Sequence, residues 1–304
     1  MFSFLNKCKQ NHIPIDVQLE VFNKTVVPCM MYGGEVWGFN NIDCLEVIQR
    51  KFLKYSLKLK SSTPTAMIYC ETGYLSIEIE LKIKTITYWV NLITGRKDKF
   101  SYKLYLICLS LYKRGLLIFP WMQNVVNILN ATGFSYIFNE QFLWEEKYLK
   151  NAFLRDIKSR IRDQAVQALF EEINNNENKF FYYRELITFH GMQKYLKKMP
   201  ADIWLQLVKI RTQNHKLPVE IYSWKIVFKP RPERTCTICE GGEVGDEYHY
   251  VMNCPVFLED RNKLLPKIKN DKSPRAFIKL LKSEDINILR GLAKFLKILF
   301  DVFD

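Results

Sequence analysis

The chain has 304 residues, of which 48% are hydrophobic and 25% charged, a composition that argues against a protein disordered along its whole length. Its 45 Lys and Arg residues outnumber its 32 Asp and Glu residues, which gives a net charge of +13. This excess favours a polyanionic partner such as nucleic acid or an anionic membrane, and its even spread excludes a neutral core with one basic tail.

Periodic apolar positions predict helices in the first sixty residues. Residues 16–31 carry apolar side chains at helical spacing, up to the Gly33-Gly34 pair. A second helix is predicted at residues 45–59, because apolar positions recur three and four residues apart before the turn cluster 61–64. The opposite face of this helix carries four basic side chains: Arg50, Lys51, Lys54 and Lys58.

Residues 77–84 alternate strictly between apolar and charged side chains, which is typical of a strand. However, Glu78 and Glu80 each precede a lysine by four residues, the favourable order on a helix, and one apolar face continues to Ile93. The sequence therefore favours a helix here. The chain also contains 12 glycines, too few for the many tight turns of a β-sandwich or barrel, so the predicted fold class is mainly α.

The second half of the chain continues the helical pattern. Three more helices are predicted, at residues 142–173, 182–198 and 200–217, the last of them ended by Pro218, whereas residues 224–234 are predicted to be extended. Ser273 and Ser283 are expected to cap the two C-terminal helices. The last helix is expected to place four leucines on one face: Leu289, Leu292, Leu296 and Leu299.

Features of a secreted or membrane-spanning protein are weak. The N-terminus does not resemble a secretory signal, and the uncharged stretch 115–139 contains several amide side chains that are costly in hydrocarbon, so an amphipathic helix is predicted there. The eight cysteines therefore indicate a reducing compartment, nuclear or cytoplasmic, without disulfides. Five of them are predicted to be small buried hydrophobic residues: Cys8, Cys29, Cys44, Cys70 and Cys108.

The other three cysteines belong to the pattern C-x2-C-x9-H-x4-C, which contains four potential metal ligands: Cys236, Cys239, His249 and Cys254. A C-x2-C turn supplies two thiolates, and the histidine and the last cysteine complete the tetrahedron that Zn²⁺ prefers. Because four protein ligands leave no open position for water, the predicted zinc site is structural. Asp246 or Glu247 is expected to hold the free ring nitrogen of His249. The alternative is a chance grouping of three buried thiols and a surface histidine.

Two basic groups are candidates for contact with nucleic acid. The first is the stripe on the predicted helix 45–59, although a solvated helix face would look the same. The second precedes the zinc pattern and combines basic with aromatic side chains, a mixture that suits single strands because aromatic rings stack on bases. Its predicted contact residues are Trp224, Lys225, Lys229, Arg231 and Arg234, with Phe228 among them.

Several motifs resemble the LINE-type (non-LTR) retrotransposon reverse transcriptases. Residues 28–38, Pro-Cys-Met-Met-Tyr-Gly-Gly-Glu-Val-Trp-Gly, are similar to that family's P-x-x-L-Y-G-x-E-x-W-G segment, in the thumb that follows the polymerase palm. The resemblance spans about residues 10–262. It continues in order through further short motifs: Ser62–Ala66, Glu71–Gly73, Tyr195-Leu196, Arg211, Asn214-His215, Leu217-Pro218, Glu220, Arg234–Cys236, Gly245–His249, Cys254-Pro255 and Arg261.

The resemblance implies an organisation of four contiguous regions: a thumb-like helical region at 1–115, a helical linker at 116–222, a Cys3His zinc knuckle at 223–262 and C-terminal helices at 263–304. The family consists of RNA-directed DNA polymerases that bind magnesium through an aspartate pair, and this chain has no two adjacent aspartates. The chain is therefore expected to be a noncatalytic C-terminal part, starting at an internal methionine, that binds RNA or DNA with the missing polymerase and endonuclease parts as further partners.

Three other interpretations stay open from the sequence. The chain could be a zinc-stabilised protein-interaction module in which the basic excess is incidental. It could be a decayed relic without function. The third and weakest alternative is an independent zinc enzyme.

Overall fold

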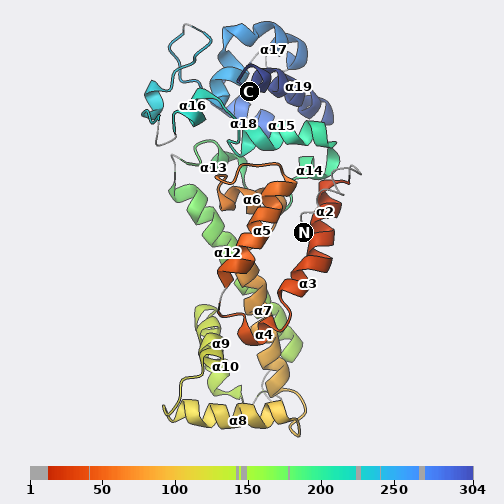
Figure 1. The fold of residues 1–304 in the computed structure, drawn as a ribbon, viewed down its shortest axis with the longest axis vertical. Coiled ribbons are helices and arrows are strands. Elements are labelled where there is room, and N and C mark those ends of the chain that lie inside the picture. The colour runs from red at the N-terminus through yellow and green to blue at the C-terminus, as the bar shows by residue number, and fades with distance from the viewer. Residues whose placement is uncertain are drawn as a thin grey trace. The chain divides into compact units, whose positions relative to one another are not determined.

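The computed structural model describes residues 13–40, 42–141, 144, 149–176, 179–223, 227–239, 241–266 and 271–303. In these residues every regular element is a helix, and β-structure is limited to two isolated bridges, Thr72 with Met192 and Thr235 with Val244 (Figure 1). The prediction of a mainly α fold is therefore confirmed. No helix in the described part of the chain is long and apolar enough to cross a membrane.

The chain forms two compact units, each assembled from segments that are distant in the sequence. Unit 1 comprises Met1–Glu20, Lys51–Tyr74 and Glu171–Asp304, and unit 2 comprises Val21–Arg50 and Leu75–Phe170. Helical periodicity shows where a helix lies but not which distant segments pack together. The four contiguous regions that the resemblance implies remain a prediction.

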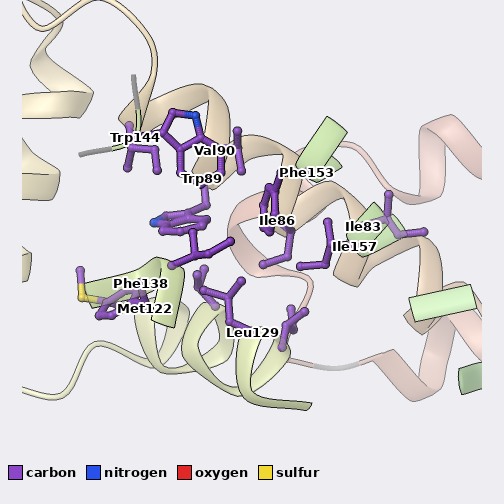
Figure 2. Packing of buried hydrophobic residues seen from close by; sticks show 14 of the residues in the cluster. Ile83, Ile86, Trp89, Val90, Met122, Leu129, Phe138, Trp144, Phe153 and Ile157 are labelled. Carbon is purple, nitrogen blue, oxygen red and sulfur yellow. The ribbon is translucent and has the colours of Figure 1, made fainter. Parts of the chain in front are cut away.

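Unit 2 contains two hydrophobic clusters, and the larger of them is aromatic and aliphatic. Trp89 is fully buried, with the ring of Phe138 stacked at 6.1 Å and the ring of Trp144 edge-on at 6.3 Å (Figure 2). The Trp89 indole N–H donates to the Tyr105 hydroxyl at 3.0 Å, so this buried donor has a hydrogen-bond partner. The elements of unit 2 are η1 (Phe22–Val26), α3 (Val27–Met30), α4 (Gly34–Trp37), α7 (Ile77–Ile93), α8 (Phe100–Lys113), α9 (Pro120–Ala131), α10 (Ser135–Asn139) and parts of α5 (Ile42–Ser56) and α12 (Lys150–Asn175).

Helix α7 occupies the segment whose alternation resembles a strand, so the prediction of a helix is confirmed. Ser76 caps it by accepting the backbone N–H of Glu78, and Glu78 pairs with Lys82 at 2.7 Å as expected. The second expected pair is not formed, because Glu80 and Lys84 pair instead with residues of α12 and α4. Burial against the rest of unit 2 therefore outweighs the period-two pattern.

Unit 1 contains the C-terminal helices and the cysteine cluster. Its elements are α2 (Ile15–Val21), α6 (Thr65–Thr72), α13 (Tyr183–Leu186), α14 (Lys194–Lys198), α15 (Ala201–Arg211), α16 (Pro218–Ile221), η3 (Arg231–Glu233), η4 (His249–Asn253), η5 (Pro255–Phe257), α17 (Leu258–Leu264), α18 (Pro274–Leu281) and α19 (Ile286–Phe303). Helix α19 packs against α15 and α17. The four leucines predicted on one face of α19 are all buried, which confirms that prediction.

The predicted helix caps are partly confirmed. Ser273 caps α18 by accepting the backbone N–H of Ala276 at 3.2 Å. The cap of α19 is Asp285 rather than Ser283, because Asp285 Oδ1 accepts the backbone N–H of Asn287 at 2.9 Å. The Ser283 hydroxyl accepts the backbone N–H of Asp285 instead, at 3.2 Å.

Three predicted helices differ from the structure in their extent. The stretch 182–198 is broken into α13 and α14, because the intervening residues run across α6 and the backbone N–H of Gln193 donates to Glu71 O at 2.9 Å. The helix predicted at 200–217 ends at Arg211, and Pro218 begins a short helix instead of ending a long one. Of the helix predicted at 142–173, α12 covers the part from Lys150 onward, and most of residues 142–148 lie outside the described residues.

The isolated cysteines are less uniformly buried than predicted. Cys29 and Cys44 are exposed, Cys108 is half-buried and Cys70 is buried, while Cys8 lies outside the described residues. The two exposed thiols lie on α3 and α5. The uncharged stretch 115–139 forms the amphipathic helix α9 as predicted, with Val125, Ile128 and Leu129 among its buried residues.

Candidate metal centre

The four predicted metal ligands come together in unit 1. The sulfur atoms of Cys236, Cys239 and Cys254 and a ring nitrogen of His249 all lie within 4.8 Å of one another. The Cys239 sulfur is 3.4 Å from His249 Nε2. Tetrahedral zinc, with bonds of about 2.0–2.3 Å, would hold its ligand atoms about 3.3–3.8 Å apart. The cluster can therefore hold a metal ion and is consistent with one zinc.

A short hairpin-like loop brings the first two ligands to the second pair. Cys236 donates its backbone N–H to Glu243 O and Gly245 donates its own to Arg234 O, both at 2.8 Å. Gly242 has a φ of +67°, which closes the loop at a conformation that favours glycine. A Cβ atom on Gly245 would lie 3.1 Å from the backbone of Cys236, so the close approach behind the first ligand also favours glycine.

The second pair of ligands is held by the π-turn η4. Cys254 donates its backbone N–H to His249 O at 2.8 Å, and this wide turn places residues five apart side by side. The buried guanidinium of Arg261 donates to three carbonyl oxygens of the same turn, including Cys254 O at 2.8 Å. The turn therefore has a fixed shape that does not depend on the metal alone.

The group that orients His249 is Glu243, not Asp246 or Glu247 as predicted. Glu243 Oε2 lies 2.5 Å from His249 Nδ1, so Nδ1 donates to the carboxylate and Nε2 faces the sulfurs with its lone pair. The Asp246 carboxylate accepts the backbone N–H of His249, three residues later, at 2.9 Å, as the side chain of a helix N-cap residue does. Glu247 is buried and bonds to the ring of His215 at 3.1 Å.

Backbone amides also prepare the first ligand for a metal. Burial raises the pKa of the Cys236 thiol, but the Tyr250 hydroxyl beside its sulfur and the amides of Ile238 and Cys239 lower this pKa to about 7. Because a thiolate is the form that binds a metal, Tyr250 and the knuckle turn together favour the liganding state of Cys236.

The predicted nucleic-acid contacts before the metal pattern are partly engaged within the protein. Arg231 pairs with Asp246 at 2.7 Å and its guanidinium lies 4.0 Å from the centre of the Phe181 ring. Arg234 donates to Lys229 O and Val219 O. Lys229 is exposed, with its ammonium 4.4 Å from the centre of the Tyr222 ring, and Trp224 and Lys225 lie outside the described residues.

The basic stripe lies on and just after α5. Lys51 and Lys58 are exposed and Arg50 is half-buried. Lys54 donates its ammonium to Ser61 O at 2.5 Å. Lys58 has a φ of +55°, because the chain turns sharply after the helix ends at Ser56.

Arg231 and Arg234 line one cleft of about 590 Å³ together with two lysines that were not among the predicted contacts. The lysines are Lys60, from the turn after α5, and Lys179, from the segment before α13. None of the four residues of the α5 stripe lines this cleft. We call it the basic cleft; its described lining residues are Lys60, Ser62, Thr63, Pro64, Asn176, Lys179, Thr212, Gln213, Asn214, His215, Glu220, Ser223, Phe228, Pro230, Arg231 and Arg234.

Glu220 is the one carboxylate among the described lining residues of the basic cleft. Burial and the nearby Glu247 raise its pKa to about 7, although His215, Arg234 and Lys60 act in the opposite direction. Since this pKa is about 4.5 in an unfolded chain, ionisation of Glu220 costs folding free energy as the pH rises from 4.5 to 7.

We therefore expect Glu220→Gln to stabilise the protein by up to about 3 kcal/mol at pH 8, and by progressively less towards pH 4.5. Urea unfolding at pH 8 and at pH 5.5 measures the difference. Glu233→Gln, at an exposed position, is the charge-matched control. An equal gain at both pH values would contradict the assigned pKa of Glu220.

The chain was compared with family models, curated proteins and solved structures, and nothing matches it.

Proposed function

We propose that this chain is a noncatalytic nucleic-acid-binding module with one structural zinc ion, corresponding to the C-terminal part of a retrotransposon reverse transcriptase. Three thiolates and one imidazole are the ligand set that zinc prefers, and four protein ligands leave no position for a reacting water. Thiolate ligands need a reducing compartment, which suits the nucleus or the cytoplasm. The net charge of +13 suits a polyanionic partner.

The observation that carries this proposal is the link between the metal centre and the basic cleft. Asp246 holds the backbone N–H of His249 with one carboxylate oxygen and the Arg231 guanidinium with the other. Tyr182 also donates to the oxygen that binds Arg231, at 2.7 Å. A metal-bound His249 would therefore fix a cationic residue of the cleft, as expected if the metal supports a binding surface.

Binding should fall steeply with salt concentration, because each phosphate contact releases counterions. For a single-stranded oligonucleotide held through about three phosphates, the affinity is expected to drop roughly twentyfold between 50 and 200 mM salt. Fluorescence anisotropy with RNA and DNA oligonucleotides of one sequence measures this slope and compares the two nucleic acids. An affinity that does not change with salt, or no binding at low salt, would contradict the proposal.

A protein-interaction module is the second candidate, favoured by helix α8. Phe100, Leu104 and Ile107 lie on one side of this helix and are exposed. An apolar helix face of this kind suits a partner helix with an apolar stripe of its own. A complex that survives both nuclease and high salt, and is lost in Ile107→Glu, would favour this candidate over the first.

A further inference from the structure

The basic cleft combines cations with an exposed aromatic ring. Its four basic side chains come from three separate segments of unit 1: the turn before α6, the segment before α13, and the stretch around η3. Phe228 is 63% exposed at the cleft, and the Arg234 guanidinium lies 5.6 Å from the centre of its ring. An exposed large aromatic side chain beside a guanidinium is a surface on which a flat ring can stack.

The remaining lining residues supply neutral hydrogen-bonding groups. Ser62, which carries a hydroxyl, and Asn176 and Gln213, which carry amides, line the same cleft. The Lys60 ammonium donates to His215 O at 3.1 Å, which fixes its stem at the cleft wall. Amides and hydroxyls recognise the edge of a base, whereas ammonium groups hold a phosphate.

The size of the cleft limits the ligand. A volume of about 590 Å³ lies within the range of small-ligand pockets, about 300–1,000 Å³. This volume accommodates a nucleoside phosphate but not a duplex, whose bases are stacked inside and cannot reach the Phe228 ring. The opposing charge is Glu220, whose pKa is raised to about 7, so near neutral pH this carboxyl group is partly protonated.

We propose that the basic cleft holds one nucleoside phosphate unit of a bound single strand, with its base stacked on Phe228 and its phosphate against Lys60 and Lys179. This inference rests on the proposed function and deepens it by assigning the binding site. The metal ligands do not line the cleft, so the metal centre acts as a support that positions Arg231 rather than as a contact surface.

Two substitutions in the full chain test the assignment. Phe228→Ala removes the stacking surface, which is worth about 1–3 kcal/mol per base, so the affinity for a uridine-rich RNA oligonucleotide is expected to fall by about fivefold to about 150-fold. Lys179→Glu is expected to weaken binding. It is also expected to reduce the slope of log affinity against log salt concentration by the amount that corresponds to about one phosphate contact. The same oligonucleotide carrying 5-iodouridine is expected to crosslink to the peptide that contains Phe228.

The controls are residues of the same kind in unit 1 that lie outside the cleft. Phe189 is 49% exposed and Lys279 is exposed on α18, so Phe189→Ala and Lys279→Glu match the two variants in chemistry. Normal binding by Phe228→Ala, or a crosslink at another segment, would overturn the assignment while leaving the proposed function intact. If the unmodified chain binds no oligonucleotide, the proposed function and this inference fail together.

Comparison with uridine monophosphate tests whether the cleft binds part of a strand or a free nucleotide. We expect the oligonucleotide to bind far more tightly than the monophosphate, with the monophosphate competing for the Phe228 crosslink at millimolar concentration. Equal affinities of the two ligands for the wild-type chain would assign the cleft to a free nucleotide and overturn the proposal of a bound strand.

Discussion

Replacing Cys236 with serine is expected to abolish zinc binding and to unfold the loop from Arg234 to Gly245. Zinc contributes about 10–16 kcal/mol to the folding of small Cys/His domains, far more than this short loop can recover from its own contacts. The loop between the two ligand pairs is held by one isolated bridge, Thr235 with Val244, and a few backbone hydrogen bonds. A hydroxyl cannot replace the thiolate, so the loop loses its principal constraint.

Native mass spectrometry measures the metal content, and hydrogen exchange locates the unfolding. The wild-type chain is expected to carry one zinc ion and Cys236→Ser none, with increased exchange concentrated in the loop from Arg234 to Gly245. Cys44→Ser is the matched control, because Cys44 is exposed on α5 and belongs to no candidate metal-ligand group among the residues that the structure describes. One zinc ion retained by Cys236→Ser, or none in the wild-type chain, would contradict the assignment of the metal site.

The clustering of the four candidate ligands was predictable because their geometry is local. The C-x2-C spacing places two thiols in one turn, and in the H-x4-C turn the backbone N–H of Cys254 donates to His249 O. The carboxylate that orients His249 was not predictable in the same way. Asp246 and Glu247 are nearer in sequence, but the bridge between Thr235 and Val244 places Glu243 opposite the ring instead.

The extent of a helix was likewise predictable where it depends on local sequence, and not where it depends on tertiary contacts. Helix α19 was predictable from its regular leucine spacing, although its cap is Asp285 and not the predicted Ser283. The break between α13 and α14 was not, because it arises where Gln193 and Met192 pair with α6, more than a hundred residues away. For the same reason only two of the four basic residues of the basic cleft were predicted from the sequence. Arg231 and Arg234 lie in one basic stretch, whereas Lys60 and Lys179 come from distant segments.

The contact between α6 and α15 brings together two motifs that the resemblance matches separately. Glu71 and Arg211 form an ion pair of 2.9 Å whose side chains are 0% and 4% exposed. Tyr195 donates its hydroxyl to the other oxygen of Glu71 at 2.8 Å. Arg211 also donates to Leu281 O at 2.9 Å, so the pair connects helices α6, α15 and α18 within unit 1.

Glu71→Ala is therefore expected to destabilise unit 1 by about 3–5 kcal/mol, because it leaves the Arg211 guanidinium buried without a counter-charge. Arg211→Met is expected to cost a similar amount by isolating the Glu71 carboxylate. The double variant is expected to cost less than the sum of the two single changes, since it removes both buried charges together. Urea unfolding of the four proteins, followed by hydrogen exchange in α6 and α15, gives the coupling energy.

An exposed ion pair in unit 1 is the control for the buried pair of Glu71 and Arg211. Lys194 and Glu284 pair at 2.7 Å, but both side chains are more than half exposed, so Glu284→Ala is expected to have little effect on the free energy of unfolding. The large effect at Glu71 thus follows from burial, since both pairs are short. Two results would contradict this expectation: single variants at Glu71 and Arg211 that cost no more than Glu284→Ala, or effects of the two that simply add. Either result would mean that the pair does not act as a buried unit and that apolar side chains maintain the contact between α6 and α15.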